Sequence, residues 1–421
     1  MKLAVIDHIG NPGGGSRVVR ALLPAFKFLR PDIEITFFGN RISVLRENIE
    51  EEFKNKRIIV KYLNSVRLTN EGLFGITGTS FIFKSIQQRY IEHYDFLPSI
   101  LSGAIHKELE QIIMGFDLAF FPWPYLIRCP LLKCPMVGIF HDFNFKYYFT
   151  GTHTFSKWQL NMLKTEMPLW IQRSTPVVST YFMAEELEKF YPMNKGKTKV
   201  VHLAPMSTMT RITKEEARKN VSDLGINKDF ILYPTNVCSH KNIGPLLASL
   251  PILKSMGHNI LLVLTGPGTE IINGHACEFG IELEETNKDV FGLGYVSNVQ
   301  MDSLIQSASV VVSTSLYEAG NGPGIDAWVR GVPVAMSNIP AFLEHIKVQD
   351  VRAEIFDPRS PVDIANKIHN ILANPEKAKA DATHSRRAIE KITWSQTAEK
   401  YLDIFDESIK KYGRDREGIS E

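Results

Sequence analysis

The sequence predicts an α/β protein with two domains, each built on a doubly wound parallel sheet. Short runs rich in Val, Ile and Phe recur along the 421 residues and alternate with stretches whose apolar residues have helical spacing. The same alternation occurs separately in each half of the chain. Because 421 residues exceed a single ordinary core, two domains of normal globular composition are expected, with 44% apolar and 22% charged residues.

The first half opens with a strand, a glycine-rich turn, a helix and a second strand, expected at 3–9, 10–16, 17–29 and 34–39. Later apolar strands are expected at 117–123, 136–140 and 176–180, the last followed by a helix at 184–190. Segment 63–110 has no clear period and is expected to be a mobile loop with short helices. A Rossmann-like domain is therefore predicted for residues 1–205.

The second half repeats this order. Strands are expected at 230–235, 259–266, 289–294, 309–315 and 332–336, with helices at 239–256 and 299–308 and a crossover helix near Pro323. A second Rossmann-like domain is predicted over 206–394. Residues 395–421 begin with apolar residues at helical spacing and should form a C-terminal helix that packs back towards the first domain.

Charge and cysteine content narrow the function classes. Residues 1–200 carry 25 basic and 18 acidic residues, a balance of +7, whereas residues 201–421 carry 23 and 28, a balance of −5. The positive charge is dispersed, which argues against nucleic acid; a solvated surface explains it, and an anionic acceptor or a membrane surface is the alternative. Four cysteines and no long apolar window indicate the cytoplasm, with peripheral contact of the N-terminal domain at the inner membrane face as an option.

The most informative segment, 315–344, places Glu318 and Asp326 eight positions apart across a glycine-rich strand-to-helix turn. Pro323 suits the first helical turn, while Gly322 and Gly324 allow backbone amides to approach a ligand closely. Such a helix end attracts phosphate, and Asp326, expected in the first turn, could accept hydrogen bonds from hydroxyl groups. An ordinary Gly/Pro turn with a capping acid is the alternative.

Lys241 is expected at the start of the helix over 239–256, with Ser239 as its N-cap. A cation there opposes the helix dipole, and a nearby anion would remove the conflict. The lysine could therefore hold a diphosphate leaving group. A lysine pointing into solvent is the alternative.

The first loop brings glycines to the start of a helix without matching a dinucleotide motif. Its glycines stand at 10, 13, 14 and 15, which is not G-x-G-x-x-G, and no acidic residue ends the next strand. NAD is therefore not expected. Gly14 and Gly15 still indicate a close backbone approach to a ligand or to the other domain, with Arg17 as an anion partner, although a tight turn explains them equally well.

His141 directly follows the strand at 136–140, at the edge where doubly wound sheets bind ligands. It could hydrogen-bond a sugar hydroxyl, although a structural role is the more common one for such a histidine. No metal is expected, because the sequence lacks a Cys/His set of the zinc type and any Asp-x-Asp pair.

Several stretches together resemble the retaining GT-B glycosyltransferases of glycosyltransferase family 4, also called group 1. The clearest are YPTNVCSHKNIGPLL, VFGLGYVSNVQMDSLIQSASVVVSTSLYE and GPGIDAWVRGVPVAMSNIPAFLEH, with looser likeness through GGGSR and FHDF in the first half. The resemblance implies two Rossmann-like domains facing across a cleft, with residues 1–205 on the acceptor side and residues 206–394 binding the nucleotide sugar.

The resemblance also implies residue roles. Glu318, His141 and Lys241 would be catalytic: Glu318 near the reacting carbon, His141 supporting the donor sugar and Lys241 neutralising the diphosphate. Asp326 stands at the family's second glutamate and would bind the ribose, while Asn236 replaces the arginine that usually accompanies the lysine. The remaining expected donor-binding residues are Asn321, Gly322, Pro323, Gly324, Gly14, Gly15 and Arg17.

The implied reaction is transfer of a hexosyl group, mannosyl or similar, from a nucleoside-diphosphate sugar to a glycan or lipid-linked acceptor, in polysaccharide synthesis. Neither a cofactor nor a metal is expected. Two alternatives remain open: a catalytically silent sugar-nucleotide-binding subunit of the same fold, and an epimerase or phosphorylase on the same scaffold.

Overall fold

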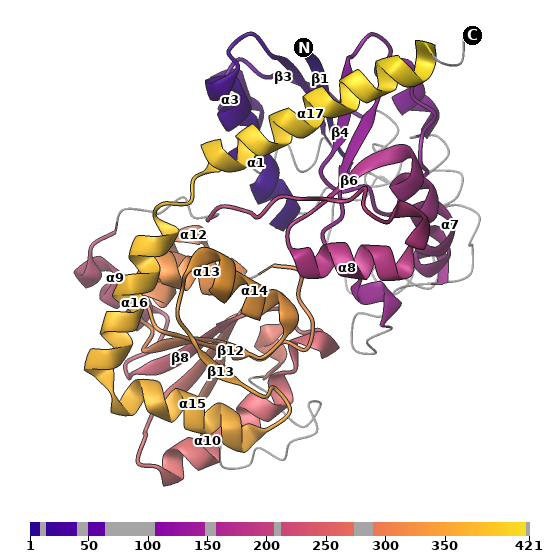
Figure 1. Cartoon of the computed structure of the whole chain (residues 1–421). Helices are drawn as coiled ribbons and strands as arrows, with labels where there is room; N and C mark the ends of the chain where they lie inside the picture. The colour runs from indigo at the N-terminus through magenta and orange to yellow at the C-terminus, as the bar shows by residue number, and fades with distance from the viewer. Residues whose placement is uncertain are drawn as a thin grey trace, which may run out of the picture. The chain divides into compact units, whose positions relative to one another are not determined.

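Figure 1 shows the computed structural model of the chain, which describes residues 1–8, 14–39, 49–63, 106–147, 157–205, 212–272, 289–320 and 322–417. Most of the long loop expected over 63–110 lies outside the described residues. The chain divides into two compact units, which are described one at a time. The first comprises Met1–Phe145, Phe155–Ala204 and Trp394–Glu421, and the second comprises Lys146–Thr154 and Pro205–Thr393.

The first unit is built on a seven-stranded sheet in which every neighbouring pair is parallel. Its strands are β1 (Lys2–Asp7), β2 (Glu34–Gly39), β3 (Ile59–Tyr62), β4 (Leu118–Phe121), β5 (Met136–Ile139), β6 (Ser174–Val178) and β7 (Lys199–Val200), in the order β3-β2-β1-β4-β5-β6-β7. The two edge strands, β3 and β7, were not predicted from the sequence. They are short and only partly buried, so they carry no long apolar run.

The helices of the first unit include α1 (Gly14–Leu29), α3 (Ile49–Lys54), α7 (Lys157–Arg173), α8 (Tyr181–Phe190) and α17 (Trp394–Glu417). The last of these packs beside α1, as Figure 1 shows in yellow. Phe405 of α17 lies 5.5 Å from Phe26 of α1 and 5.3 Å from Phe120 of β4, measured between ring centroids. The C-terminal helix therefore contributes aromatic side chains to the first unit's core.

The second unit contains a six-stranded sheet, again with every neighbouring pair parallel. Its strands are β8 (Phe230–Pro234), β9 (Leu261–Thr265), β10 (Val290–Gly292), β11 (Val310–Ser313), β12 (Val334–Ser337) and β13 (Glu354–Phe356), in the order β10-β9-β8-β11-β12-β13. The predicted fold class, two α/β domains with parallel sheets, is thus confirmed.

Helices cover both faces of the second sheet, and each face has its own core. α10 (Ile243–Ser255) and α15 (Pro361–Ala373) cover one face (Figure 1). The other carries α9 (Lys214–Asp223), α12 (Asn298–Ser307), α13 (Gly322–Val329), α14 (Pro340–Gln349) and α16 (Pro375–Ile389). Along β8, Ile231 and Tyr233 enter the first core and Phe230 and Leu232 the second, as expected for a strand buried on both faces. No helix in the described ranges has both the length and the apolarity to cross a bilayer.

Candidate functional site

The strand order of the second unit creates a topological switch point between β8 and β11. The chain continues from β8 to β9 on one side, and β11 pairs with β8 on the other. Connections leave the carboxyl ends of these two strands in opposite directions, which opens a crevice where α/β proteins bind ligands. Lys241 lies on the connection after β8 and Glu318 on the connection after β11.

Lys241 and Glu318 form an ion pair, with Lys241 Nζ donating to Glu318 Oε1. Both side chains are largely buried, at 19% and 21% exposure. The Ser315 hydroxyl donates to the same oxygen at 2.7 Å. Burial alone would lower the pKa of Lys241, but the Glu318 charge and hydrogen bond raise it above its usual value. The lysine is therefore a fixed positive charge at neutral pH.

Hydrogen bonds join the two connections that carry this pair. The Tyr233 hydroxyl donates to the Lys241 carbonyl at 2.9 Å and contacts the Ser315 hydroxyl at 3.1 Å. The backbone N–H of Leu316 donates to the His240 carbonyl at 2.7 Å. Because the backbone on both sides of the ion pair is fixed, the geometry of the two charges is set before a ligand arrives.

The helix start predicted at Ser239 is wrong. Residues Ser239–Lys241 form a separate 3₁₀ turn, and α10 begins at Ile243 after Asn242, which has φ of 53°. The Asn242 amide donates to the carbonyls of Thr314, at 3.1 Å, and Pro358, at 2.7 Å. These bonds stabilise the left-handed backbone and place Lys241 beside β11 rather than on the helix end.

Asn236 lies in a turn that is in close contact with the loop after β9. Its carbonyl accepts hydrogen bonds from the Cys238 N–H at 3.0 Å and the Thr235 hydroxyl at 3.2 Å. Gly266, after β9, has φ of 134°, and a Cβ at this position would lie 1.7 Å from the Thr235 carbonyl oxygen. Only glycine permits this crossing, and Gly266 was not predicted from the sequence.

The turn before α13 is partly described. Asn321 lies outside the described residues, and the helix begins at Gly322, followed by Pro323 and the buried Gly324. Asp326 is the fifth residue of α13, so its expected place in the first turn is wrong. Its carboxylate Oδ1 lies 3.9 Å from Nη1 of Arg330, a buried arginine that was also not predicted from the sequence.

His141 belongs to the first unit and follows β5. Its Nε2 donates to the Pro122 carbonyl at 2.7 Å, and its ring stacks on Trp123 with centroids 4.7 Å apart. Burial lowers the pKa of His141 to about 4, so the imidazole is neutral at physiological pH. Since Nε2 carries the proton, Nδ1 is the acceptor of this ring.

A second histidine of the first unit has the same arrangement and was not predicted. His8 follows β1, and its Nε2 donates to the Tyr125 carbonyl at 2.8 Å. Burial lowers the pKa of His8 to about 4. Both histidines thus bond to the connection after β4, the strand between β1 and β5. The shared signal in the sequence is a histidine directly after an apolar strand.

Gly14 and Gly15 open α1, which therefore begins earlier than the predicted Arg17. Arg17 is exposed. Of the predicted site residues that the structure describes, Lys241 and Glu318 are shown in direct contact.

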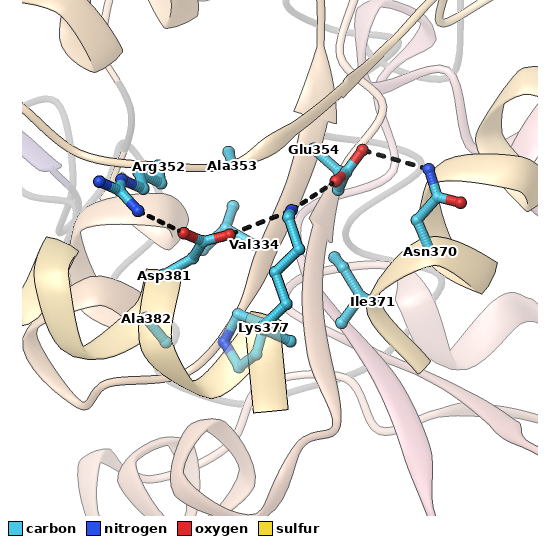
Figure 2. Close-up of a pocket in the computed structure, with 11 residues that line it drawn as sticks. Val334, Arg352, Ala353, Glu354, Asn370, Ile371, Lys377, Asp381 and Ala382 are labelled. Carbon is cyan, nitrogen blue, oxygen red and sulfur yellow. Dashed lines mark hydrogen bonds and ion pairs between the residues drawn. The ribbon is translucent and has the colours of Figure 1, made fainter. Parts of the chain in front are cut away.

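Figure 2 shows a pocket of about 60 Å³ in the second unit, and none of its lining residues is a predicted site residue. Its charged groups neutralise one another: Lys377 Nζ lies 3.5 Å from Glu354 and 3.2 Å from Asp381, which also pairs with Arg352 at 2.7 Å. We therefore interpret this cluster as structural support for α16.

Comparisons with known proteins find glycosyltransferases, and the family match lies within the second unit. Residues 214–387 match the family model described as glycosyl transferases group 1. An uncharacterised glycosyltransferase of Methanocaldococcus jannaschii is 24% identical over 237 residues, which is 55% of this chain and 60% of that protein. The chain thus matches less than two thirds of that relative's length. An MMP α-(1→4)-mannosyltransferase of Mycolicibacterium hassiacum is 24% identical over 115 residues, 27% of this chain and 28% of the relative.

Solved structures match the chain over nearly its whole length. Anabaena HepE, crystallised with UDP-glucose, superposes with a TM-score of 0.67 and 14% identity, covering 97% of this chain and 100% of HepE. At this identity the likeness establishes the fold alone. The two parallel-sheet domains are those of the GT-B fold.

Proposed function

We propose that this chain, a GT-B protein with a glycosyltransferase group 1 domain over residues 214–387, is a retaining hexosyltransferase that uses a nucleoside-diphosphate sugar. The observation that carries the proposal is the Lys241–Glu318 pair at the switch point between β8 and β11. A glycan or lipid-linked molecule would be the acceptor. HepE was crystallised with UDP-glucose and one relative is named a mannosyltransferase, so a hexosyl donor is the consistent choice.

In this proposal Lys241 stabilises the charge that develops on the leaving diphosphate. A fixed ammonium in a largely buried site interacts strongly with an anion, because little water screens it. Glu318 would orient the lysine before the donor binds and then contact the donor sugar near its reacting carbon. At the amino end of α13, Gly322 and Gly324 would add backbone N–H groups directed at phosphate, and Pro323 would fix the backbone of the first helical turn.

The other predicted residues would bind the remaining parts of the donor. Asp326 would accept hydrogen bonds from the ribose hydroxyls, and the neutral His141 would bond the donor sugar. Asn236, Gly14, Gly15 and Arg17 would complete the diphosphate site. Catalysis would then come from positioning and charge stabilisation, with the leaving phosphate accepting the acceptor's proton. We place the reaction in the cytoplasm, with the basic first domain as the side that meets a membrane-bound acceptor.

The central test removes each member of the ion pair. Lys241→Ala and Glu318→Ala should each lower sugar transfer at least a hundredfold, because each removes charge stabilisation or its positioning. Lys254→Ala, an exposed lysine on α10, is the matched control and should keep wild-type turnover. Circular dichroism checks that all three variants fold. Near-wild-type turnover in both site variants would refute the proposed site.

Donor and stereochemistry are tested on the wild-type protein. A panel of UDP-, GDP- and ADP-sugars is screened by thermal stabilisation and by donor hydrolysis, and proton NMR of the product reads the anomeric configuration. We expect retention, and activity that persists in EDTA because no metal is required. Inversion, or loss of activity in EDTA that added Mg²⁺ or Mn²⁺ restores, would contradict the mechanism.

A silent sugar-nucleotide-binding subunit is the second candidate, favoured by Asn236 where a second positive charge is expected and by the shorter Asp326. Such a subunit would bind a nucleotide sugar in calorimetry and neither hydrolyse nor transfer it.

A further inference from the structure

Arg330 is a buried arginine that links the predicted ribose-binding residue to a neighbouring helix. It directly follows α13, and its side chain is 5% exposed. The guanidinium forms an ion pair with Asp302 of α12, which is 4% exposed, through Nη2. Nη1 donates to the backbone carbonyl of Asp326 at 2.8 Å and lies 3.9 Å from the Asp326 carboxylate.

A guanidinium this deep is costly unless a carboxylate neutralises its charge, and Asp302 provides that charge. Burial lowers the pKa of Arg330 to about 10, so the side chain stays protonated at neutral pH. Arg330 is therefore a permanent positive charge fixed between α12 and the carboxyl end of α13.

The two carboxylates contact Arg330 differently. Asp302 accepts a direct hydrogen bond, whereas the 3.9 Å separation from Asp326 exceeds hydrogen-bond length. The attraction to the Asp326 carboxylate is thus electrostatic. It restricts the side-chain orientation without a hydrogen bond from Arg330 to this carboxylate.

We propose that Arg330, held by Asp302, is a positioning residue that orients the Asp326 carboxylate towards the ribose hydroxyls of the nucleotide. The inference rests on the proposed function, because it takes Asp326 as the ribose-binding residue. Two adjacent hydroxyls are bound well by a carboxylate whose rotamer is already fixed, since less side-chain entropy is lost on binding.

The test is calorimetry with UDP, GDP and ADP, each compared with its 2′-deoxy form, on the full chain. The wild type should bind at least one ribonucleotide more tightly than its deoxy form, and Asp326→Asn should remove this preference. In Arg330→Met we expect affinity for the ribonucleotide to fall about tenfold, with less than a twofold change for the deoxy form. Arg330→Lys should restore part of the preference because it keeps the charge.

Two further variants separate positioning from folding. Arg330→Met leaves Asp302 buried without its partner, so the neutral pair Asp302→Asn with Arg330→Gln is measured as well. It should fold, as judged by circular dichroism, and still show the reduced ribose preference. Adding Arg330→Met to Asp326→Asn should cause no further loss of preference, because both changes act on one interaction. Arg352→Met, at an exposed arginine of the same unit, is the matched control.

The outcomes distinguish the two proposals. If the wild type binds none of the three nucleotides, or Asp326→Asn leaves the ribose preference unchanged, the assignment of Asp326 and the proposal built on it both fail. If Asp326→Asn behaves as expected but the Arg330 variants and the neutral pair keep full ribose preference, the Arg330 inference alone is overturned.

Discussion

At the scale of single residues, the fold contains groups that would be destabilising by themselves. Each is stabilised by a partner that lies far away in the sequence. A lysine as buried as Lys241 would be destabilising alone, and Glu318, 77 positions away, neutralises it. Asn242 occupies a left-handed backbone conformation that bonds to two carbonyls compensate. These residues lie in the loops after β8 and β11, where we expect the donor to bind.

Gly266 lies so close to the Thr235 carbonyl that the position has no room for a side chain. Gly266→Ala should lower the free energy of unfolding by roughly 4 kcal/mol or more, since the new Cβ would overlap the Thr235 carbonyl and force the loop apart. Gly257→Ala is the matched control in the same unit: its φ is 90°, but no atom lies within 4 Å of the added Cβ. That variant should lose only about 1–2 kcal/mol from backbone strain. Urea unfolding compares the two, and equal losses would contradict the close crossing.

At the scale of elements, helix pairs on the second sheet are joined by polar contacts as well as apolar ones. His258, after α10, and His369, on α15, lie 2.8 Å apart between Nε2 and Nδ1. Two imidazoles at this distance can share one proton but repel when both are protonated. Burial and the neighbouring His369 lower the pKa of His258.

Because the pKa of His258 is lowered in the folded chain, the stability of the fold depends on pH. The unfolded chain binds the proton of His258 more readily than the folded chain, so the contribution to stability is fully present above about pH 6.5 and declines as pH falls. We expect His369→Gln to reduce this acid-side decline, measured by urea unfolding between pH 7.5 and 5. His384→Gln, at a histidine of α16 outside this pair, should leave it unchanged. A decline of wild-type size in His369→Gln would show that the pair does not titrate as described.

At the scale of the whole molecule, the chain completes its first unit with its last helix. Trp394–Glu417 forms α17, which packs on α1 through Phe405 and pairs Asp406 with Arg30 at 2.6 Å. The Arg30 hydrogen bond lowers the pKa of Asp406, so this pair loses its contribution only as the solution becomes strongly acidic. The first unit therefore depends on residues that follow the whole of the second.

Removal of residues 394–421 tests this dependence. Tyr401 and Phe405 are fully buried, and their loss should lower the melting temperature of the first unit by roughly 10 °C or more. The second unit should keep its own transition, because its two cores contain no residue of α17. Calorimetry with limited proteolysis separates the units. Equal decreases in the melting temperatures of both units would contradict the assignment of α17 to the first unit alone.

Much of the fold was predictable from local patterns. Buried parallel strands leave continuous apolar runs such as VVVS in β11, so the central strands of both sheets were identified. Edge strands such as β3 and β7 expose part of their surface and have no such run. The start of α10 was misplaced because Ser239 looks like an N-cap in sequence, whereas bonds from Asn242 to Thr314 and Pro358 decide where the helix begins.

The sequence by itself determined the α/β class, the two domains, and the residue types of the diphosphate site that we propose, because periodicity and turn chemistry act over a few residues. The strand order was decided only by tertiary structure, since it depends on packing between distant segments. That order makes β8 and β11 neighbours and so joins Lys241 to Glu318. It also brings Asp302 to Arg330 beside Asp326, a contact that no local pattern encodes.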